Sequence, residues 1–484
     1  MRVVTYNTNT FGTEVGGSPV RTVRSEADIV FEAIGEETVN GIARPADIIL
    51  LQEQQQVGST TEDLRQRLNA IYADQGITYA RGQLNPAITA DPGSGPGRLD
   101  AGEIRQSFLY RTDSVQLITE DFFGNISNPT QPRSTQFIRF RPVGFGEEAD
   151  LFVFNSHFEA DNQTSDLFAR ENEATDIRDF ISANDLGFRN VIVAGDLNVD
   201  SNFETSGEPD FGGLSALQIL AAGTDAGGRV LDPLFPDGGS VTFHNNEDLA
   251  DQLTQSPSGG AGPLTGGGID DRFDFILQSD ELLDGEGVAS IPGSLRPFGN
   301  NGSTFNDQIN DGNTVVIDGL TSFTTAEVLD ALEAASDHLP VVEDFQLPAT
   351  LTAELTTAVP EEVVQGDAAS ILLAISNGTD VDAVLGADEL DFVFTTTEGL
   401  DGEGSGIDAA LDEAFLAAVS LDTSEIGVFE EFITITSLSF ADPVGEIVIP
   451  VSFTVIPVPE PGTLAFAGGL MSAGLVRRRH HRGE

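Results

Sequence analysis

The sequence predicts a layered α/β domain followed by a smaller all-β domain. The chain has 484 residues, and at about 150 residues per domain this length indicates two or three domains. Up to about residue 346, short apolar runs alternate with amphipathic stretches, a pattern typical of strands interleaved with helices. Beyond it, helical patterns become few and the apolar runs are rich in Val, Ile, Phe and Thr. We therefore expect domains at 1–346 and 347–457 and a separate segment at 458–484.

The elements of the first domain follow from the spacing of its apolar residues. Buried strands are expected where short apolar runs are bounded by polar residues, at 3–6, 48–51, 107–110, 151–155, 191–194 and 273–277. Helices are expected at 27–34, 63–72 and 167–181, where apolar residues recur with helical spacing. Glycine and proline cluster at 91–97 and 257–268, and strand-like runs resume after each cluster. These clusters indicate long surface loops.

The second domain reads as an antiparallel β-sandwich of about 100 residues. Its strand-like runs lie at 370–375, 391–395, 432–439 and 446–455, and the stretch 411–419 is expected to be a helix or a covering loop. This part of the chain shows no group of residues typical of catalysis. A spacer or adhesion module is the expected role.

The composition excludes several classes of function. Basic residues number 23 and acidic residues 78, giving a formal charge of −55, and every basic residue is arginine. Such a field repels nucleic acid and anionic lipid at long range, which excludes a binder that depends on a basic surface, but it is compatible with an enzyme that recruits divalent cations. Cysteine is absent, which excludes disulfides, thiolate metal sites and cysteine nucleophiles.

Polar motifs lie at or just beyond the ends of the expected strands, where α/β sheets usually present ligand groups. They are TYN at 5–7, LLQE at 50–53, NSH at 155–157, AGDLN at 194–198 and SDH at 336–338, with DRFDF at 271–275 placing acids before and within a strand. An isolated acid at a strand end is usually a helix cap or part of a turn, so the co-occurrence carries the signal. Of the five histidines, His157 and His338 lie in these motifs, whereas His244 is expected to be a loop residue.

The order TYNTNTFG, LLQE, NSHF, GDLN, RFDFIL, SDHLPV resembles the endonuclease/exonuclease/phosphatase superfamily over about 340 residues. The NTFG run and a histidine in the third motif favour the deoxyribonuclease-like branch, although sphingomyelinase-like members also carry a histidine there. The resemblance implies a four-layered α/β sandwich. It also implies a metal-dependent phosphoric ester hydrolase.

The resemblance assigns the metal and phosphate residues. Glu53 is the principal ligand of Mg²⁺, with Mn²⁺ or Ca²⁺ as alternatives, and Asn7 supports it; carboxylate and amide oxygens suit such hard cations. Asp337 lies beside the metal or the attacking water. Asp196 orients that water or is a second metal ligand, and Asn198 positions the phosphate.

The remaining roles are acid–base and electrostatic. By resemblance, His338 is the general base or stabilises the transition state, oriented by Asp274 or alternatively by Asp271. His157 contacts the phosphate or protonates the leaving group. Two further residues are assigned more loosely: Glu103 as a partner of His157 or a surface acid, and Arg133, by its position, as a phosphate clamp or an ordinary exposed arginine.

The last segment contains Pro-Glu-Pro at 459–461, an apolar run at 463–476 and an arginine cluster. Fourteen apolar residues span about 21 Å as a helix, short for a hydrocarbon core of about 30 Å. The order resembles the PEP-CTERM sorting signal of Gram-negative bacteria. It implies export, recognition by sorting machinery in the membrane and removal of the tail, without an obligate protein partner. Since Met1 opens directly into a strand, we expect an export leader upstream of it.

These features together predict an exported nuclease acting on extracellular nucleic acid. A phosphodiesterase for phospholipids or small phosphate esters is the second hypothesis, because the fold permits all these substrates. A non-enzymatic surface or matrix protein is the third.

Overall fold

The computed structural model describes residues 1–10, 22–54, 59–82, 106–123, 134–224, 227–236, 239–260, 262 and 264–459. The strands of its α/β part are β1 (Arg2–Asn7), β2 (Ile48–Gln52), β3 (Tyr79–Arg81), β4 (Ser107–Arg111), β5 (Val115–Phe123), β6 (Thr135–Pro142), β7 (Leu151–His157), β8 (Asn190–Asp196), β9 (Asp274–Gln278), β10 (Arg296–Pro297) and β11 (Val341–Asp344). The α-helices are α1 (Glu26–Glu36), α2 (Thr60–Ile71), α3 (Thr164–Ala183), α4 (Ala216–Ala221) and α5 (Thr325–Ala335). Short 3-10 helices lie at η1 (Ala73–Gln75), η2 (Glu147–Ala149), η3 (Pro209–Phe211), η5 (Glu247–Gln252) and η6 (Asp280–Leu282).

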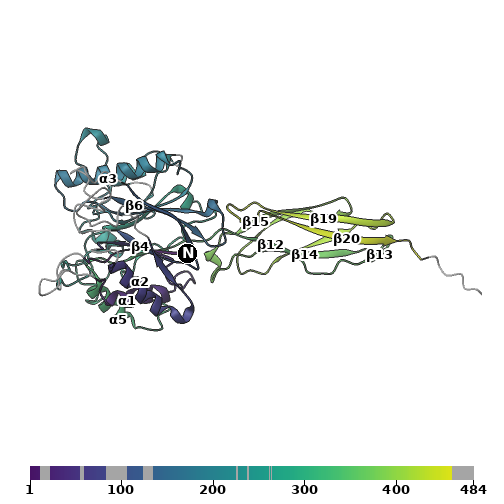
Figure 1. Ribbon diagram of the computed structural model, residues 1–484, viewed down its shortest axis with the longest axis horizontal. Coiled ribbons are helices and arrows are strands. Elements are labelled where there is room, and N and C mark those ends of the chain that lie inside the picture. Colours follow the sequence, from purple (N-terminus) through teal and green to yellow (C-terminus); the bar gives the residue numbers. More distant parts are fainter. Residues whose placement is uncertain are drawn as a thin grey trace, which may run out of the picture.

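Two sheets form the centre of the α/β part. One has the strand order β10-β11-β1-β2-β4-β3 and the other β5-β6-β7-β8-β9. Alternate residues along a strand point to opposite faces. On β1, Val3 joins the apolar cluster between the sheets, whereas Val4 packs in the cluster that contains Val30 of α1. Helices α1, α2 and α5 lie on one side and α3 on the other (Figure 1). The predicted four-layered α/β sandwich is confirmed.

The β-sandwich contains β12 (Leu351–Leu355), β13 (Glu362–Val364), β14 (Ser370–Asn377), η7 (Val384–Gly386), β15 (Leu390–Thr396), β16 (Leu400–Asp401), β17 (Gly404–Asp408), β18 (Phe415–Leu421), β19 (Gly427–Ser437) and β20 (Glu446–Ile456). Its sheets have the orders β12-β14-β18-β16 and β13-β20-β19-β15-β17. The all-β part of the fold prediction is thus confirmed. The expectation of a helix or covering loop at 411–419 is wrong for 415–419, where β18 alternates exposed Leu416 with buried Val419 and Leu421 at period two.

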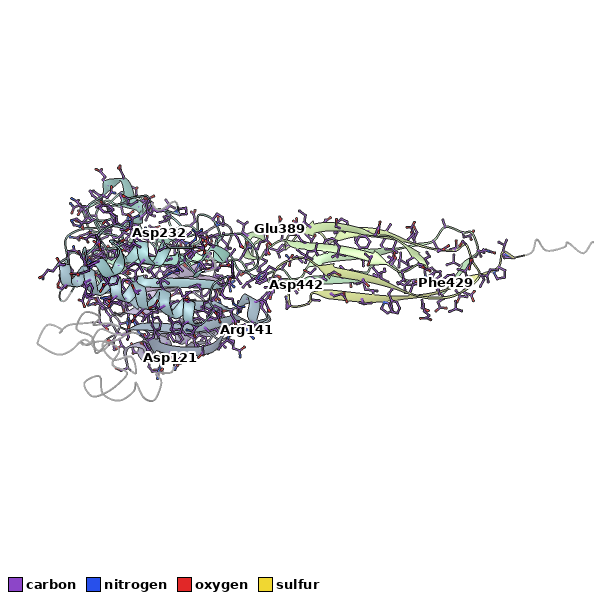
Figure 2. The ribbon with its side chains drawn as sticks, turned by 90° about the horizontal axis from the view of Figure 1, so that it is seen from above. Asp121, Arg141, Asp232, Glu389, Phe429 and Asp442 are labelled. Carbon is purple, nitrogen blue, oxygen red and sulfur yellow. The ribbon has the colours of Figure 1, made fainter. Side chains whose placement is uncertain are left out.

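The sandwich extends away from the α/β part, and Figure 2 places Glu389 and Asp442 near the junction and Phe429 toward the far end. A specific contact joins the two parts: the Gly287 amide donates to the Asp388 carboxylate (2.8 Å). Within the described ranges, no helix has the length and apolar character to cross a membrane.

Candidate active site

Strand direction brings the polar motifs to one end of the two sheets. Strands β1 and β2 are parallel and end at Asn7 and Gln52, one residue before Glu53. Strands β7 and β8 are also parallel, and the register pairs His157 with Asp196. Strand β9 runs antiparallel to β8 and begins at Asp274, which pairs with Asp196. All these side chains therefore lie at one end of the sheets, because the parallel strands end there and the antiparallel strand β9 begins there.

The loop after α5 supplies the last motif. Thr324 accepts a hydrogen bond from the Glu327 amide and starts α5, which ends at Ala335, directly before Ser336-Asp337-His338. The Ser336 hydroxyl donates to the Asn7 carbonyl (2.7 Å) and accepts from the His338 amide (3.2 Å). This contact fixes the loop to the end of β1.

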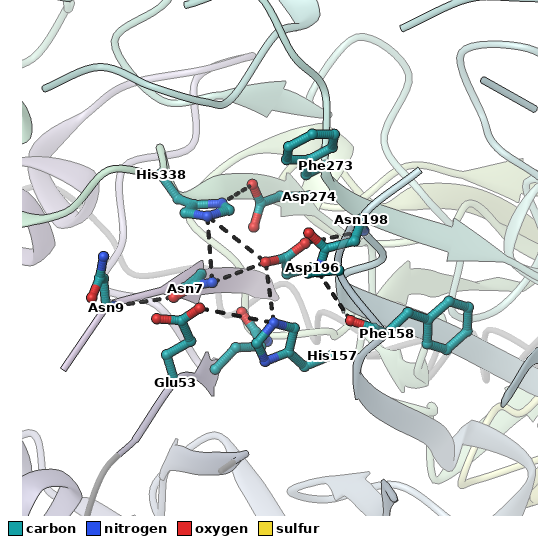
Figure 3. Close-up of polar contacts among 12 residues, drawn as sticks. Asn7, Asn9, Glu53, His157, Phe158, Asp196, Asn198, Phe273, Asp274 and His338 are labelled. Carbon is teal, nitrogen blue, oxygen red and sulfur yellow. Dashed lines mark hydrogen bonds and ion pairs between the residues drawn. The ribbon is translucent and has the colours of Figure 1, made fainter. Parts of the chain in front are cut away.

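Asp196 is the centre of the group (Figure 3). Its Oδ2 accepts a hydrogen bond from Asn7 Nδ2 at 2.9 Å and lies 3.5 Å from His157 Nε2 and 3.7 Å from His338 Nε2. The side chain of Asp196 is only 2% exposed. Burial, with a smaller contribution from Asp274, raises the pKa of Asp196 to about 7, although His338 opposes the shift.

The structure distinguishes the two carboxylates considered for His338. Nδ1 of His338 lies 2.8 Å from Asp274 Oδ2, and both side chains are buried. Since a carboxylate accepts hydrogen bonds, this contact places a proton on Nδ1 and leaves Nε2 facing Asp196. Burial opposes protonation of the ring, but Asp274 and Asp196 outweigh it and hold the pKa of His338 well above its ordinary value.

The alternative partner, Asp271, pairs instead with His244: its Oδ1 lies 2.5 Å from His244 Nδ1. His244 does lie outside regular secondary structure, as expected, and Asp200, Asp270 and Asp271 lie near it. The hydrogen bond to Asp271 raises the pKa of His244, and burial raises the pKa of Asp271 to about 6. The sequence could not show this pair because 26 residues separate its members.

Three side chains could together hold a metal ion. One ligand atom each from Glu53, His157 and Asp196 lies within 4.8 Å of the others, and His157 Nε2 is 3.9 Å from Glu53 Oε1. Two carboxylates and one imidazole fit a divalent cation, and the mixed set suits Mn²⁺ as well as Mg²⁺. Glu53 has a left-handed backbone (φ 54°), and its carbonyl accepts from the Thr10 amide at 3.1 Å.

Asn7 and Asp337, the other two residues expected to bind the metal, hydrogen-bond within the protein. Asn7 Oδ1 accepts a hydrogen bond from the backbone amide of Asn9 (3.0 Å). Nδ2 of the same side chain donates to Asp196. Asp337 accepts from Asn9 Nδ2 (2.7 Å) and from the Thr265 amide (2.8 Å). Both of its oxygens are engaged, and it is not part of the three-residue ligand group.

Asn198 follows β8 with a left-handed backbone (φ 49°). Its amide nitrogen donates to Asp196 Oδ1 (3.1 Å), and its side-chain nitrogen donates to the Phe158 carbonyl (3.0 Å). Asn198 therefore lies beside the group, and it fixes the turns after β7 and β8. Glu103 and Arg133 lie outside the described residues.

Gln255 is a site residue that the sequence analysis missed. Its Nε2 lies 3.1 Å from His338 Nε2, and its backbone forms bridges with both Asp271 and His338. It lies just before the glycine-rich cluster at 257–268 and carries no strand-end motif, so no sequence signal indicated it. Asn9, which holds Asp337, was missed although it lies in the TYNTNTFG run.

No protein-family model and no curated protein sequence matches this chain. Solved structures are similar to it. An endonuclease/exonuclease/phosphatase from Beutenbergia cavernae has 14% identity, covering 93% of this chain and 99% of its own, at TM-score 0.35. The human nocturnin catalytic domain with bound sulfate has 13% identity, 72% and 93% coverage and TM-score 0.37. TDP2 of D. rerio with a single-strand DNA product has 14% identity, 72% and 98% coverage and TM-score 0.37. At these low identities and scores, the case for the site rests on its own geometry.

Proposed function

We propose that this protein is an exported, metal-dependent phosphodiester hydrolase that acts on extracellular nucleic acid. The supporting observation is the convergence of two carboxylates and two imidazoles on one point: Glu53, His157 and His338 surround Asp196 at the end of both sheets. Hydrolysis of a phosphodiester needs neutralisation of the phosphoryl oxygens, an oriented water and help for the leaving oxygen. This set of side chains offers each of these.

Glu53 and Asp196 would hold the cation, with His157 as the third ligand. Mg²⁺ is our first candidate, with Mn²⁺ or Ca²⁺ as alternatives. The bound cation would neutralise charge on the phosphoryl oxygens. Asn7 fixes Asp196 by its 2.9 Å hydrogen bond, so one carboxylate of the ligand set is oriented before any cation binds.

His338 is positioned to hold or move a proton at Nε2. Asp274 fixes the ring through Nδ1 at 2.8 Å, which leaves Nε2 available toward Asp196 and the substrate. Asp274 also favours the charged form of the ring, which suits a group that gives a proton to a leaving oxygen.

Nucleic acid is the proposed substrate because the opening motif resembles deoxyribonucleases and because a sorting signal would expose the protein to extracellular DNA. The test is a substrate panel of plasmid DNA, RNA, sphingomyelin and bis(p-nitrophenyl) phosphate with Mg²⁺, Mn²⁺ and Ca²⁺. We expect DNA hydrolysis that EDTA abolishes. Activity confined to sphingomyelin would identify a lipid phosphodiesterase, and inactivity on the whole panel with every cation would refute hydrolysis.

Export has its own test. If the segment after residue 458 is a PEP-CTERM signal, mass spectrometry of protein recovered outside its native host cells should show a chain without residues 477–484. An intact carboxyl terminus in that material would refute processing.

A further inference from the structure

We propose that Gln255 contacts the phosphoryl group of the substrate, donating a hydrogen bond from its side-chain amide to an oxygen that lies beside His338. This inference rests on the proposed function, because it adds a residue to the same site.

The first support is an excess of donors around His338 Nε2. Gln255 Nε2 lies 3.1 Å and Asn7 Nδ2 lies 3.4 Å from this ring nitrogen. Asn7 Nδ2 already donates to Asp196 Oδ2. That oxygen lies 3.7 Å from His338 Nε2, which exceeds ordinary hydrogen-bond length. Each primary amide carries two N–H groups, whereas His338 Nε2 has one lone pair and accepts at most one hydrogen bond. An oxyanion is the kind of ligand that completes such an arrangement.

The second support is the rigid placement of Gln255. Its amide donates to the Asp271 carbonyl (3.0 Å), and its own carbonyl accepts from the amides of Asp270 (2.9 Å) and Asp271 (3.0 Å). On the other side, the Leu339 amide donates to the carbonyl of the preceding Thr254 (2.8 Å). The backbone is therefore held between the strand that leads to Asp274 and the loop that carries His338. A donor on fixed backbone binds with little ordering cost.

The third support is access and charge. Asn7, His157 and His338 are buried, whereas Gln255 is partly exposed, so Gln255 is the one of these four that solvent-borne substrate reaches first. An uncharged amide can hold a phosphoryl oxygen beside the acids of this site without forming an ion pair with them.

The test compares Gln255→Leu with Gln365→Leu. Gln365 is a partly exposed glutamine of the β-sandwich whose side-chain amide donates to the Ser424 carbonyl (2.8 Å), so its replacement is a matched control. With Mg²⁺ or Mn²⁺ present, we measure binding of inorganic phosphate by calorimetry and both kcat and KM for bis(p-nitrophenyl) phosphate. We expect Gln255→Leu to weaken phosphate binding and kcat/KM about 10- to 100-fold, the value of one hydrogen bond to a charged group. Gln365→Leu should change neither.

Gln255→Glu is the second variant, which keeps the size of the side chain and adds a charge that repels phosphate. It should bind phosphate more weakly than Gln255→Leu does. If both folded Gln255 variants bind phosphate like the wild type, the inference is wrong, even where kcat falls through a disturbed His338 ring. If the wild type neither hydrolyses any ester nor binds phosphate, the proposed function fails and this inference fails with it. If the wild type hydrolyses the ester and Gln255→Leu has the same phosphate binding and kcat/KM, this inference alone is overturned.

Discussion

Gly195 lies between Ala194 and Asp196 on β8, and its replacement by alanine should damage both stability and catalysis. Its φ is +139°, a conformation that residues with a side chain rarely adopt. A Cβ atom placed there would lie 1.8 Å from the Ser156 carbonyl oxygen, whereas real Cβ contacts stay beyond 3.0 Å. Strand β7 would have to retreat by more than about 1 Å, and Ser156 directly precedes His157.

The expected magnitude has two parts. The unfavourable φ contributes about 1–2 kcal/mol, and the displaced strand brings the total loss to about 3–5 kcal/mol. A shift of about 1 Å in reacting groups costs roughly 10²-fold in rate. Urea unfolding and kcat on bis(p-nitrophenyl) phosphate measure the two effects. Gly144→Ala is the matched control, since Gly144 has φ +95° and no atom within 4 Å of the added Cβ. The reasoning is refuted if Gly195→Ala unfolds with the free energy of Gly144→Ala and keeps the wild-type kcat.

Three further predictions concern single groups. Glu53→Gln should raise the Mg²⁺ concentration needed for activity with little effect on urea unfolding. Glu147→Gln is the control, because the side chain of Glu147 is 67% exposed, and it should leave the Mg²⁺ titration unchanged. Equal Mg²⁺ titrations of the two variants would contradict the ligand role of Glu53. His338→Ala and Asp274→Asn should each lower kcat by about 10²- to 10⁴-fold, and the double variant should be no worse than either, because the 2.8 Å pair acts as one unit; additive losses would show independent roles. Burial raises the pKa of Glu343 to about 8, so the free energy of unfolding should decline as pH rises from about 4.5, where the unfolded chain loses this proton, through 8. Glu343→Gln should abolish that decline, and an unchanged dependence of the free energy of unfolding on pH would refute the assignment.

Strand-end motifs could be predicted because the chemistry of the site coincides with the periodicity of the fold. Asn7, His157 and Asp196 each close an apolar run that is recognisable from the sequence, and parallel strands then bring them together. The identity of the carboxylate beside His338 could not be settled in this way. Asp271 and Asp274 are three residues apart, and only the antiparallel register of β9 on β8 places Asp274 opposite Asp196.

Residues that act through loops gave no comparable signal. Gln255 reaches His338 because Thr254 and Asp271 fix its backbone, and these contacts depend on tertiary structure. Dependence on tertiary structure also explains why β18 was not predicted as a strand. Its period-two alternation is short and begins at Phe415, and pairing with β14 decides the strand over the expected helix or covering loop.

The position of the site relative to the β-sandwich favours a spacer over a regulatory domain. The Met1 amino group donates to the Phe345 carbonyl (2.5 Å), so the beginning of β1 lies where the chain leaves β11 toward Leu347 and the sandwich. Asn7 lies at the other end of β1, five residues and about 17 Å further along the strand. The sandwich therefore continues from the sheet end opposite the site, and its last strand, β20, leads into the carboxyl-terminal segment. Glu53, Asp196 and His338 thus lie on the side away from the sandwich, which is the position expected where the sandwich acts as a spacer.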